Sequence, residues 1–339
     1  MSSQNNRSLR VLFLPPGPSQ KVPWFKDVLD SIGPRHILTV FDPNLDLEPQ
    51  FSGVEVVVDF GGKLGTHKMA DLAAGRVLLW QILGSGFDHF DIAYWNSRSI
   101  PVANCPGMLS SSPLADCALM FMLMLARQWN RSEENLQRGD LYNPVGTEME
   151  GKALGLIGFG ASARELALKV RPFHMRTLAI DILDISAVDQ DRFGLNYAGK
   201  PADIDHVVAT SDFLSLHLHL NEATYHLIDA RRIGLMKSTA FLINVARGAL
   251  VDEEALLTAL RERRIGGAGL DVFASEPITS DNLLLTLDNV VATPHIAGVT
   301  EETSKRRAAF AAANVERIAA GLEPLSLVPS DLAHATRQQ

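Results

Sequence analysis

Three polar side chains in the second half of the chain stand shortly after apolar runs, where strands are expected to end. Arg247 follows the run FLIN, Glu276 follows GLDV, and His295 follows VVA and a proline. In parallel α/β sheets the chemistry gathers at the carboxyl ends of the strands. An arginine, an acid and a histidine at one sheet edge therefore indicate chemistry on a small anionic substrate.

The three residue types suit redox chemistry at a carbon beside a carboxylate. Arg247 offers a rigid fork that holds a carboxylate at two points and polarises an adjacent carbonyl. Histidine titrates near neutral pH, so His295 is the candidate for moving the alcohol proton. Glu276 would fix the tautomer of His295 and stabilise its imidazolium. An arginine at a strand end is often only a surface ion pair, and a lone histidine is often structural, so the assignment depends on an electron carrier nearby.

Residues 151–181 have the order that such a carrier requires: strand, glycine turn, helix, strand, acid. The turn reads G-x-G-x-x-A through Gly158, Gly160 and Ala163. Gly158 permits the tight turn, and Gly160 lets the backbone approach a pyrophosphate at the helix start. Asp181 would accept hydrogen bonds from the ribose hydroxyls and repel a 2′-phosphate, which favours NAD over NADP. The alternative is a structural glycine turn in another kind of α/β protein.

Apolar runs and helical spacings alternate along the chain on both sides of this motif. Strands are predicted at 9–14, 37–41, 54–58, 77–83, 100–103, 153–157, 178–180, 207–209, 213–218, 241–244, 269–272 and 290–292. Helices are predicted at 24–32, 69–74, 163–170 and 300–321. We therefore expect an α/β fold in which a Rossmann-type doubly wound parallel sheet domain is inserted in a split, smaller flavodoxin-like α/β substrate domain. The expected bounds are 106–298 for the NAD-binding domain, and 1–105 with 299–339 for the substrate domain.

A strongly apolar helix is expected to link the two domains. Ser112 is its predicted N-cap and Pro113 its first residue, and it ends near Arg127. Because it is apolar on nearly every side, it must be buried, either at a domain or subunit interface or in an ordinary core. A polar amphipathic helix and a loop follow over residues 129–150.

Composition limits the classes of function. The chain has 46% hydrophobic and 21% charged residues, which predicts a globular protein. Its net charge is -8, so nucleic acid is an unlikely partner. Cys105 and Cys117 have neither metal-ligand spacing nor a disulfide framework. The longest apolar run, 114–126, contains Asp116 and is too short to cross a bilayer. These observations predict a cytoplasmic protein without a metal site.

From about Val77 to Gly298 the chain resembles the D-isomer-specific 2-hydroxyacid dehydrogenases, a family that includes phosphoglycerate, glyoxylate/hydroxypyruvate and D-lactate dehydrogenases. The matching motifs are GSGFDHFD, IPVANCPG, GLIGFGASA, LSLHLHLNEATYHLI, NVARGALVDEEAL, GLDVFASEP and TPHIAG. The resemblance implies hydride transfer between NAD and a small 2-hydroxy or 2-oxo acid. It also implies a homodimer, in which the apolar helix from Pro113 and the loop after it embrace the partner.

The resemblance assigns a role to each candidate residue. Arg247 becomes the substrate arginine, Glu276 the acid paired with the histidine, and His295 the proton donor. The implied cofactor contacts are Gly158, Phe159, Gly160, Ala161, Ser162, Asp181, His217, Leu218, Val245, Ala246, Arg247, Asp271, His295 and Gly298. The implied substrate contacts are Ser85, Gly86, Asn104, Arg247 and His295.

Some positions depart from the family pattern. Ala163 replaces the usual third glycine, and His219 stands where the family commonly has a proline, in a loop beside the cofactor. The first 75 residues match poorly, although they would determine the substrate. Lys63 would either meet a distal anionic group of the substrate or be an ordinary solvated lysine. The alternative to an enzyme is an NAD(H)-binding regulator of the co-repressor type, which shares the fold and keeps the three catalytic residue types.

Overall fold

The computed structural model describes residues 7–15, 23–61 and 64–329. Lys63, considered above as a substrate contact, lies outside the described residues. The chain divides into two compact units: Met1–Leu109 with Thr300–Gln339, and Ser110–Val299. We call the first the split unit and the second the continuous unit, and each is described by itself.

The split unit is built on a five-stranded parallel sheet in the order β2-β1-β3-β4-β5. Its strands are β1 (Arg10–Leu14), β2 (Ile37–Val40), β3 (Val56–Asp59), β4 (Leu79–Ile82) and β5 (Val102–Ala103). Its helices are α1 (Pro23–Ile32), α2 (Leu47–Gln50), α3 (His67–Ala73), α4 (Ile92–Ser97) and α12 (Glu301–Ala319), with a 3-10 turn, η1, at Gly107–Leu109. This strand order is that of flavodoxin-like sheets.

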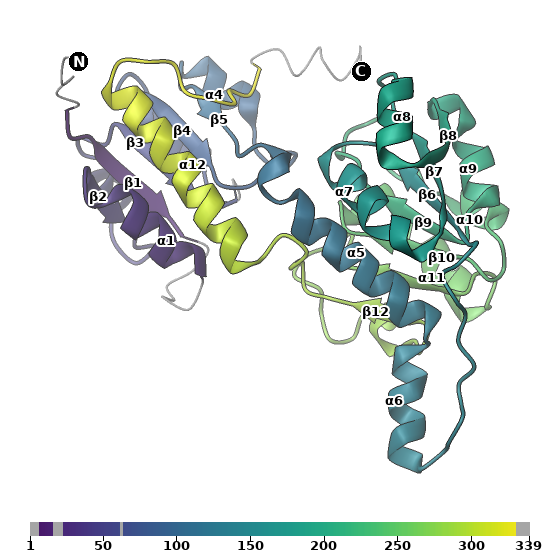
Figure 1. The fold of residues 1–339 in the computed structure, drawn as a ribbon. Helices are drawn as coiled ribbons and strands as arrows, with labels where there is room; N and C mark the ends of the chain where they lie inside the picture. The colour runs from purple at the N-terminus through teal and green to yellow at the C-terminus, as the bar shows by residue number, and fades with distance from the viewer. Residues whose placement is uncertain (1–6, 16–22, 62–63, 330–339) are drawn as a thin grey trace. The chain divides into compact units, whose positions relative to one another are not determined.

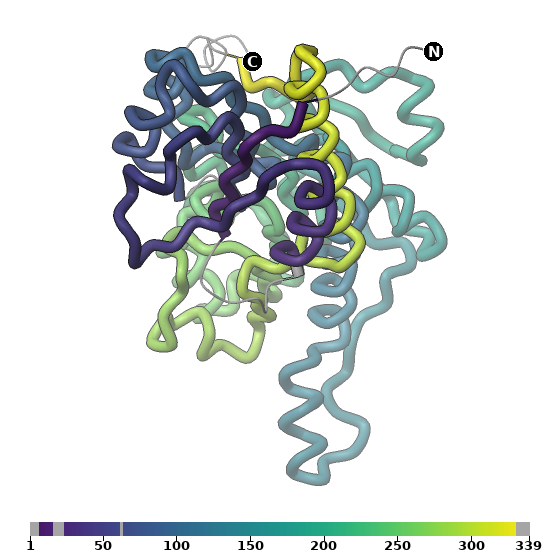
Figure 2. Tube along the Cα trace, turned by 90° about the vertical axis from the view of Figure 1, so that its left-hand side faces the viewer, coloured from purple at the N-terminus to yellow at the C-terminus, as the bar shows by residue number. Residues whose placement is uncertain are grey.

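Both faces of this sheet are covered. Alternate residues of β1, Val11 and Phe13, pack with α1 and α12, which lie side by side (Figures 1 and 2). The intervening residues Leu12 and Leu14 pack on the opposite face with α3 and α4. A strand buried on both faces favours apolar residues at successive positions, which is why residues 11–14 of β1 and 56–58 of β3 are apolar without interruption.

The continuous unit contains a seven-stranded parallel sheet in the order β12-β11-β10-β9-β6-β7-β8. Its strands are β6 (Ala153–Ile157), β7 (Arg176–Ile180), β8 (Leu195–Gly199), β9 (Phe213–Leu216), β10 (Phe241–Asn244), β11 (Gly267–Leu270) and β12 (Val290–Ala292). Its helices are α5 (Ser111–Ala126), α6 (Trp129–Arg138), α7 (Ala161–Val170), α8 (Ala187–Phe193), α9 (Ile204–Thr210), α10 (Ala230–Leu235) and α11 (Glu253–Arg261). Four 3-10 segments are η2 (Arg171–Phe173), η3 (Pro201–Asp203), η4 (Gly248–Leu250) and η5 (Leu283–Thr286).

Helices cover both faces of this larger sheet, so it is doubly wound. One core joins the strands to α9, α10 and α11, and another joins them to α5 and α7. The chain runs from β6 to β7 on one side and later returns to β9 on the other, so the strand order reverses at β6. The expected Rossmann-type α/β fold is confirmed, and the reversal gives the crevice where such sheets bind ligands.

Two local predictions were wrong. Residues 207–209 are not a strand but part of α9, because Ile204, Val207 and Val208 are spaced for a helix and bury one face against β6 and β7. The second concerns α5, whose N-cap is Ser110 and not the predicted Ser112, so the helix begins at Ser111. Ser110 makes no side-chain capping hydrogen bond, so the Ser-Pro signature did not mark the boundary.

The apolar helix α5 packs against α7 and β10–β12 and is largely a core helix of the continuous unit. By contrast, α6 has no buried residue and stands away from the body of this unit (Figures 1 and 2). Within the described residues, we find no helix with the length and apolar character needed to span a bilayer.

Candidate active site

The turn between β6 and α7 is shaped by its two glycines. Gly158 has a φ of +87°, and a Cβ there would lie 2.6 Å from the carbonyl oxygen of His217. Gly160 is the N-cap of α7, and a Cβ there would meet open space. Unlike α11 and α12, which are capped by Asp252 and Thr300, α7 receives no side-chain cap. Its first N–H groups can therefore serve an anion.

Asp181 lies directly beside this turn, at the end of β7. Its Oδ2 accepts a hydrogen bond from the Phe159 backbone N–H at 2.6 Å, and its Oδ1 accepts from Leu183 N–H at 2.9 Å. The carboxylate is thus fixed at the end of the strand next to the glycine turn, and it remains partly exposed. An uncapped helix start with an acid beside it fits a dinucleotide, whose diphosphate and ribose need these two groups.

Two serine hydroxyls hold the His217 ring, and one of them belongs to the helix that starts at this turn. Its Nδ1 lies 2.9 Å from Ser162 Oγ in the first turn of α7, and its Nε2 lies 2.9 Å from Ser215 Oγ on β9. Burial lowers the pKa of His217 to about 4. Leu218, the next residue, approaches Gly158. The expected contacts Ala161 and Ser162 occupy the start of α7.

The lowered pKa of His217 predicts acid destabilisation. An unfolded histidine binds a proton near pH 6.5, whereas folded His217 does so only near pH 4, so acidification through this window favours unfolding. When the pH falls from 7.5 to 4.5, the decrease in the free energy of unfolding should be roughly 2–3 kcal/mol smaller for His217→Gln than for the unchanged protein. Urea unfolding at both pH values measures this. The exposed His206→Gln serves as the control, and equal losses for the two variants would contradict the expectation.

The three candidate catalytic residues come from the adjacent strands β10, β11 and β12. His295 Nδ1 lies 2.8 Å from Glu276 Oε2. The other carboxylate oxygen, Oε1, accepts from the Phe273 backbone N–H at 3.2 Å. Because Glu276 occupies Nδ1, Nε2 is the ring nitrogen that can exchange a proton with a substrate. The His295 side chain is 45% exposed, so a substrate can reach it.

Buried Asp271 holds the backbone around His295. Its carboxylate accepts from Thr293 Oγ1 at 2.6 Å, Ile296 N–H at 2.7 Å and Ala297 N–H at 2.8 Å. Burial raises the pKa of Asp271, and these hydrogen bonds oppose the increase. They fix His295 with a φ of +56°, a left-handed conformation that costs free energy outside glycine. The resemblance gave Asp271 only a cofactor contact. The structure also makes it the anchor of the histidine loop, which continues to Gly298.

Arg247 lies in the turn after β10 that contains Val245 and Ala246. Asn244 shapes this turn, because its side chain donates to the Arg247 carbonyl at 2.8 Å and accepts from Ala246 N–H at 3.1 Å. The guanidinium donates to the Ala246 carbonyl at 2.8 Å. A Cβ on Gly248 would lie 1.9 Å from the Phe273 backbone, so the arginine turn packs directly on the turn before Glu276.

The remaining candidate residues belong to the split unit. Asn104, after β5, donates from Nδ2 to the Ser85 carbonyl at 2.7 Å, and its Oδ1 accepts from Ser326 Oγ at 2.9 Å. Gly86 is buried next to Ser85. The structure therefore brings the loop after β4 and the loop after β5 together at the carboxyl edge of the smaller sheet.

Sequence reasoning missed the residues that position the others. Asn244, Thr293 and Ser215 orient the arginine turn, Asp271 and His217 respectively. Asn244 had a usable signal, since asparagine at the end of an apolar strand commonly forms a turn through its side chain. Thr293 had none, because it acts on Asp271, 22 residues away. Ser215 lies only two residues before His217 and on the same strand run, but a serine within an apolar run does not by itself predict a hydrogen bond to a following histidine. His219 lies in the loop after β9, where its carbonyl accepts from Thr224 Oγ1 at 2.8 Å.

Comparison with known proteins decides the family. Residues 119–297, more than half of the chain, match the family described as D-isomer specific 2-hydroxyacid dehydrogenase, NAD binding domain. The chain belongs to the D-isomer specific 2-hydroxyacid dehydrogenases. It is 36% identical over 256 residues to a glyoxylate reductase of Thermofilum pendens, covering 73% of each chain. It is also 36% identical over 267 residues to glyoxylate/hydroxypyruvate reductase B of Yersinia pestis, covering 77% of this chain and 79% of the relative.

A solved structure agrees with this assignment. The D-lactate dehydrogenase from Aquifex aeolicus, complexed with NAD and lactic acid, superposes with a TM-score of 0.78 at 27% identity, covering 92% of this chain and 96% of that one. As a D-2-hydroxyacid dehydrogenase, this protein is an NAD-dependent oxidoreductase, as the motifs predicted. The family implies a dinucleotide site, and the uncapped α7 and Asp181 fit it.

Proposed function

We propose that the protein reduces small 2-oxo acids of the glyoxylate or hydroxypyruvate type, with Arg247, Glu276 and His295 as its catalytic residues. The observation that supports this most directly is the 2.8 Å contact between His295 and Glu276, on the strand edge that also contains the Arg247 turn. Relatives named glyoxylate reductase and glyoxylate/hydroxypyruvate reductase favour these substrates over larger ones. In this proposal the continuous unit binds NAD, and the split unit supplies Ser85, Gly86 and Asn104 as substrate contacts.

Arg247 would bind the substrate carboxylate and polarise the neighbouring carbonyl. Its planar fork matches a carboxylate at two points. The turn that holds it is fixed by Asn244 and by the close approach of Gly248 to Phe273, so the guanidinium loses little freedom when the substrate binds.

His295 would donate the proton that the substrate oxygen needs as the carbonyl becomes an alcohol. Charged His295 gives the proton from Nε2, while Nδ1 keeps its hydrogen bond to Glu276. The carboxylate stabilises the imidazolium before the transfer and preserves the ring orientation afterwards. When bound, NAD(H) supplies the hydride chemistry. In the oxidation direction neutral His295 accepts the alcohol proton at the same nitrogen.

A panel of oxo acids tests the proposed activity. Purified protein with NADH should turn over glyoxylate and hydroxypyruvate at rates well above those with pyruvate and phenylpyruvate, measured by the loss of NADH absorbance. Firm NADH binding without turnover of any oxo acid would refute the proposal. That result would favour the alternative function, an NAD(H)-binding regulator of the co-repressor type.

We also propose that the protein is a homodimer. The segment from α6 to residue 145 exposes large apolar side chains: Leu136 is 79% exposed, Tyr142 95% and Val145 80%. A monomer in water gains nothing from such exposure. The exposed segment therefore favours burial in a second copy of the chain.

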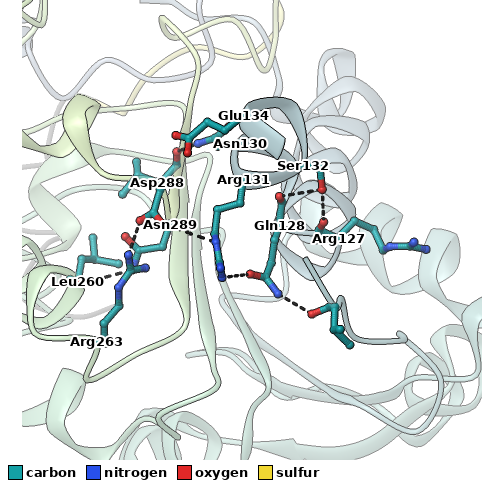
Figure 3. Close-up of polar contacts among 12 residues, drawn as sticks. Arg127, Gln128, Asn130, Arg131, Ser132, Glu134, Leu260, Arg263, Asp288 and Asn289 are labelled. Atoms are coloured by element: carbon teal, nitrogen blue, oxygen red, sulfur yellow. Dashed lines mark hydrogen bonds and ion pairs between the residues drawn. The ribbon is translucent and has the colours of Figure 1, made fainter. Parts of the chain in front are cut away.

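A hollow of about 640 Å³ lies beside the base of this segment, within the same unit. Its lining includes Met124, Phe213, Phe241 and Val291. Polar groups flank it (Figure 3): Arg131 donates to Gln128 and approaches Asp288, and Arg263 pairs with Asp288. Asn289 also lines it, and its buried Oδ1 has no hydrogen-bond partner among the residues that the structure describes. The exposed arm and this hollow, which is lined by both apolar and polar groups, are the two surfaces that we expect a two-fold axis to bring together.

Mass measurement tests the dimer. Light scattering after size exclusion should give twice the chain mass for the unchanged protein and a single chain mass for Leu136→Asp combined with Tyr142→Asp. The control, Val188→Asp, places the same charge at a residue that is 76% exposed on α8, and it should remain dimeric. A monomeric unchanged protein, or a dimer unaffected by the arm substitutions, would refute this interface.

We further propose a cytoplasmic location. Cys105 and Cys117 are both free thiols in the structure. Burial raises the pKa of each to about 12, so neither forms a reactive thiolate at neutral pH. Free thiols suit a reducing compartment.

A further inference from the structure

The ends of β7 and β8 bring a lysine beside the acid assigned to the ribose. Ile180 and Gly199 are paired in register, and Asp181 N–H donates to the Gly199 carbonyl at 3.2 Å. The next residues, Asp181 and Lys200, therefore leave neighbouring strands at the same edge of the sheet. Lys200 Nζ reaches back over this edge and donates to the Ile182 carbonyl at 2.9 Å.

This ammonium is paired with a second acid. Lys200 Nζ lies 2.6 Å from Asp184 Oδ1, and the hydrogen bond from Lys200 lowers the pKa of Asp184. The Asp184 side chain is 93% exposed and that of Lys200 is 45% exposed. The pair is thus open to solvent, on the loop that directly follows Asp181.

The other cation near the glycine turn is engaged elsewhere. The Arg164 guanidinium donates to the Phe159 carbonyl at 3.1 Å and pairs with Asp189 at 3.2 Å. It also lies over the rings of Phe159 and Phe193. Moving it to a new anion would break all of these contacts, whereas the contacts of Lys200 are one exposed counter-ion, Asp184, and the Ile182 carbonyl.

We propose that Asp184 is a second determinant of the preference for NAD, and that it acts by neutralising Lys200. A 2′-phosphate on the ribose beside Asp181 would extend over residues 182–184, where the Lys200 ammonium lies. Asp184 occupies that ammonium, so the lysine is not available to pair with the phosphate. NADP is then excluded by two acids rather than one. The inference rests on the proposed role of Asp181 at the ribose.

The two acids make separable contributions. Removing Asp181 deletes the acceptor for the ribose hydroxyls and one negative charge, but it leaves Lys200 paired. The single variant should therefore bind NADH more weakly and gain little affinity for NADPH. Removing Asp184 as well releases Lys200 for the phosphate, so the gain in NADPH affinity from this second step depends on the lysine.

The experiment is a double-mutant cycle in the Asp181→Ala background. Dissociation constants for NADPH and NADH are measured by nucleotide fluorescence with D181A, D181A/D184N, D181A/K200M and D181A/D184N/K200M. Adding D184N to D181A should tighten NADPH binding about three- to fivefold, the upper part of the range for an exposed charge pair. The same change in the K200M background should have no effect. The control D181A/D205N, which neutralises an acid on α9 that pairs with Arg231 on α10, should have no effect either.

The outcomes distinguish the role of Asp181 at the ribose from the role of Asp184 beside Lys200. If D181A binds NADH as tightly as the unchanged protein, the ribose assignment of Asp181 fails and the inference fails with it. If D181A weakens NADH binding but adding D184N leaves the NADPH affinity unchanged, only the inference about Asp184 is overturned. The same holds if D184N tightens NADPH binding equally in the K200M background. A gain in NADPH affinity that requires Lys200 supports it.

Discussion

Replacing His295 by alanine is expected to lower kcat for oxo acid reduction by about 10³-fold, within the range for loss of a general acid. The affinity for NADH should stay near that of the unchanged protein. The reason is geometric: with Nδ1 bonded to Glu276, the only ring nitrogen left for the substrate is Nε2. Steady-state turnover and NADH fluorescence titration measure the two quantities separately.

A matched histidine controls this result. His206→Ala removes an exposed imidazole from α9 of the same unit and should leave kcat unchanged. A fall in NADH affinity with His295→Ala that matches the fall in turnover would contradict the proton-transfer role and make His295 a cofactor contact only. Glu276→Gln should also lower turnover, because the amide no longer provides the negative charge that stabilises the imidazolium.

Replacing Arg247 by alanine is expected to lower kcat/KM for oxo acids by about 10²–10³-fold, comparable to the loss of one donor to a developing oxyanion. Both the anion clamp and carbonyl polarisation are lost, so KM should rise and kcat should fall together. Arg247→Lys keeps the charge but not the two-point geometry and should recover only part of the activity. Kinetics over a range of glyoxylate concentrations give both constants.

The turn that contains Arg247 also supports the fold, so stability must be checked beside activity. The urea midpoint of Arg247→Ala should remain close to that of the unchanged protein, because Asn244 holds the turn through the backbone of residues 246 and 247. An unchanged KM for glyoxylate in a stable variant would show that the guanidinium does not bind the carboxylate.

Sequence pattern predicted the parts of this molecule that depend on neighbouring residues. The β6 turn and α7 follow from glycines with defined steric roles, and Asp181 follows from its place after an apolar run. Strands buried on both faces, such as β6, were found because nearly every residue in them must be apolar. The pairing of Glu276 with His295 was inferred from the chemistry that both residues would need, together with a family resemblance.

Features that depend on distant contacts were not predictable in this way. Residues 207–209 of α9 are apolar and resemble a strand when they are considered alone. They are helical because one face of α9 packs against β6 and β7, which are distant in the sequence. Asp271 holds the His295 loop across more than twenty residues, and no local pattern encodes that distance. The pairing of Lys200 with Asp184 depends on the register between β7 and β8, and β8 itself was not predicted.

The discontinuity of the split unit fixes an order of events on the ribosome. The apolar face of β1 and β3 is completed by α12, through Ala308, Ala311 and Val315. Synthesis at ~5–20 residues per second delivers α12 about 10 to 40 seconds after residue 109 has been made. Residues 110–299 can fold during that interval as a closed segment, while one face of the earlier sheet is covered only by α1. We therefore expect this part of the sheet to keep apolar surface exposed until the last helix emerges.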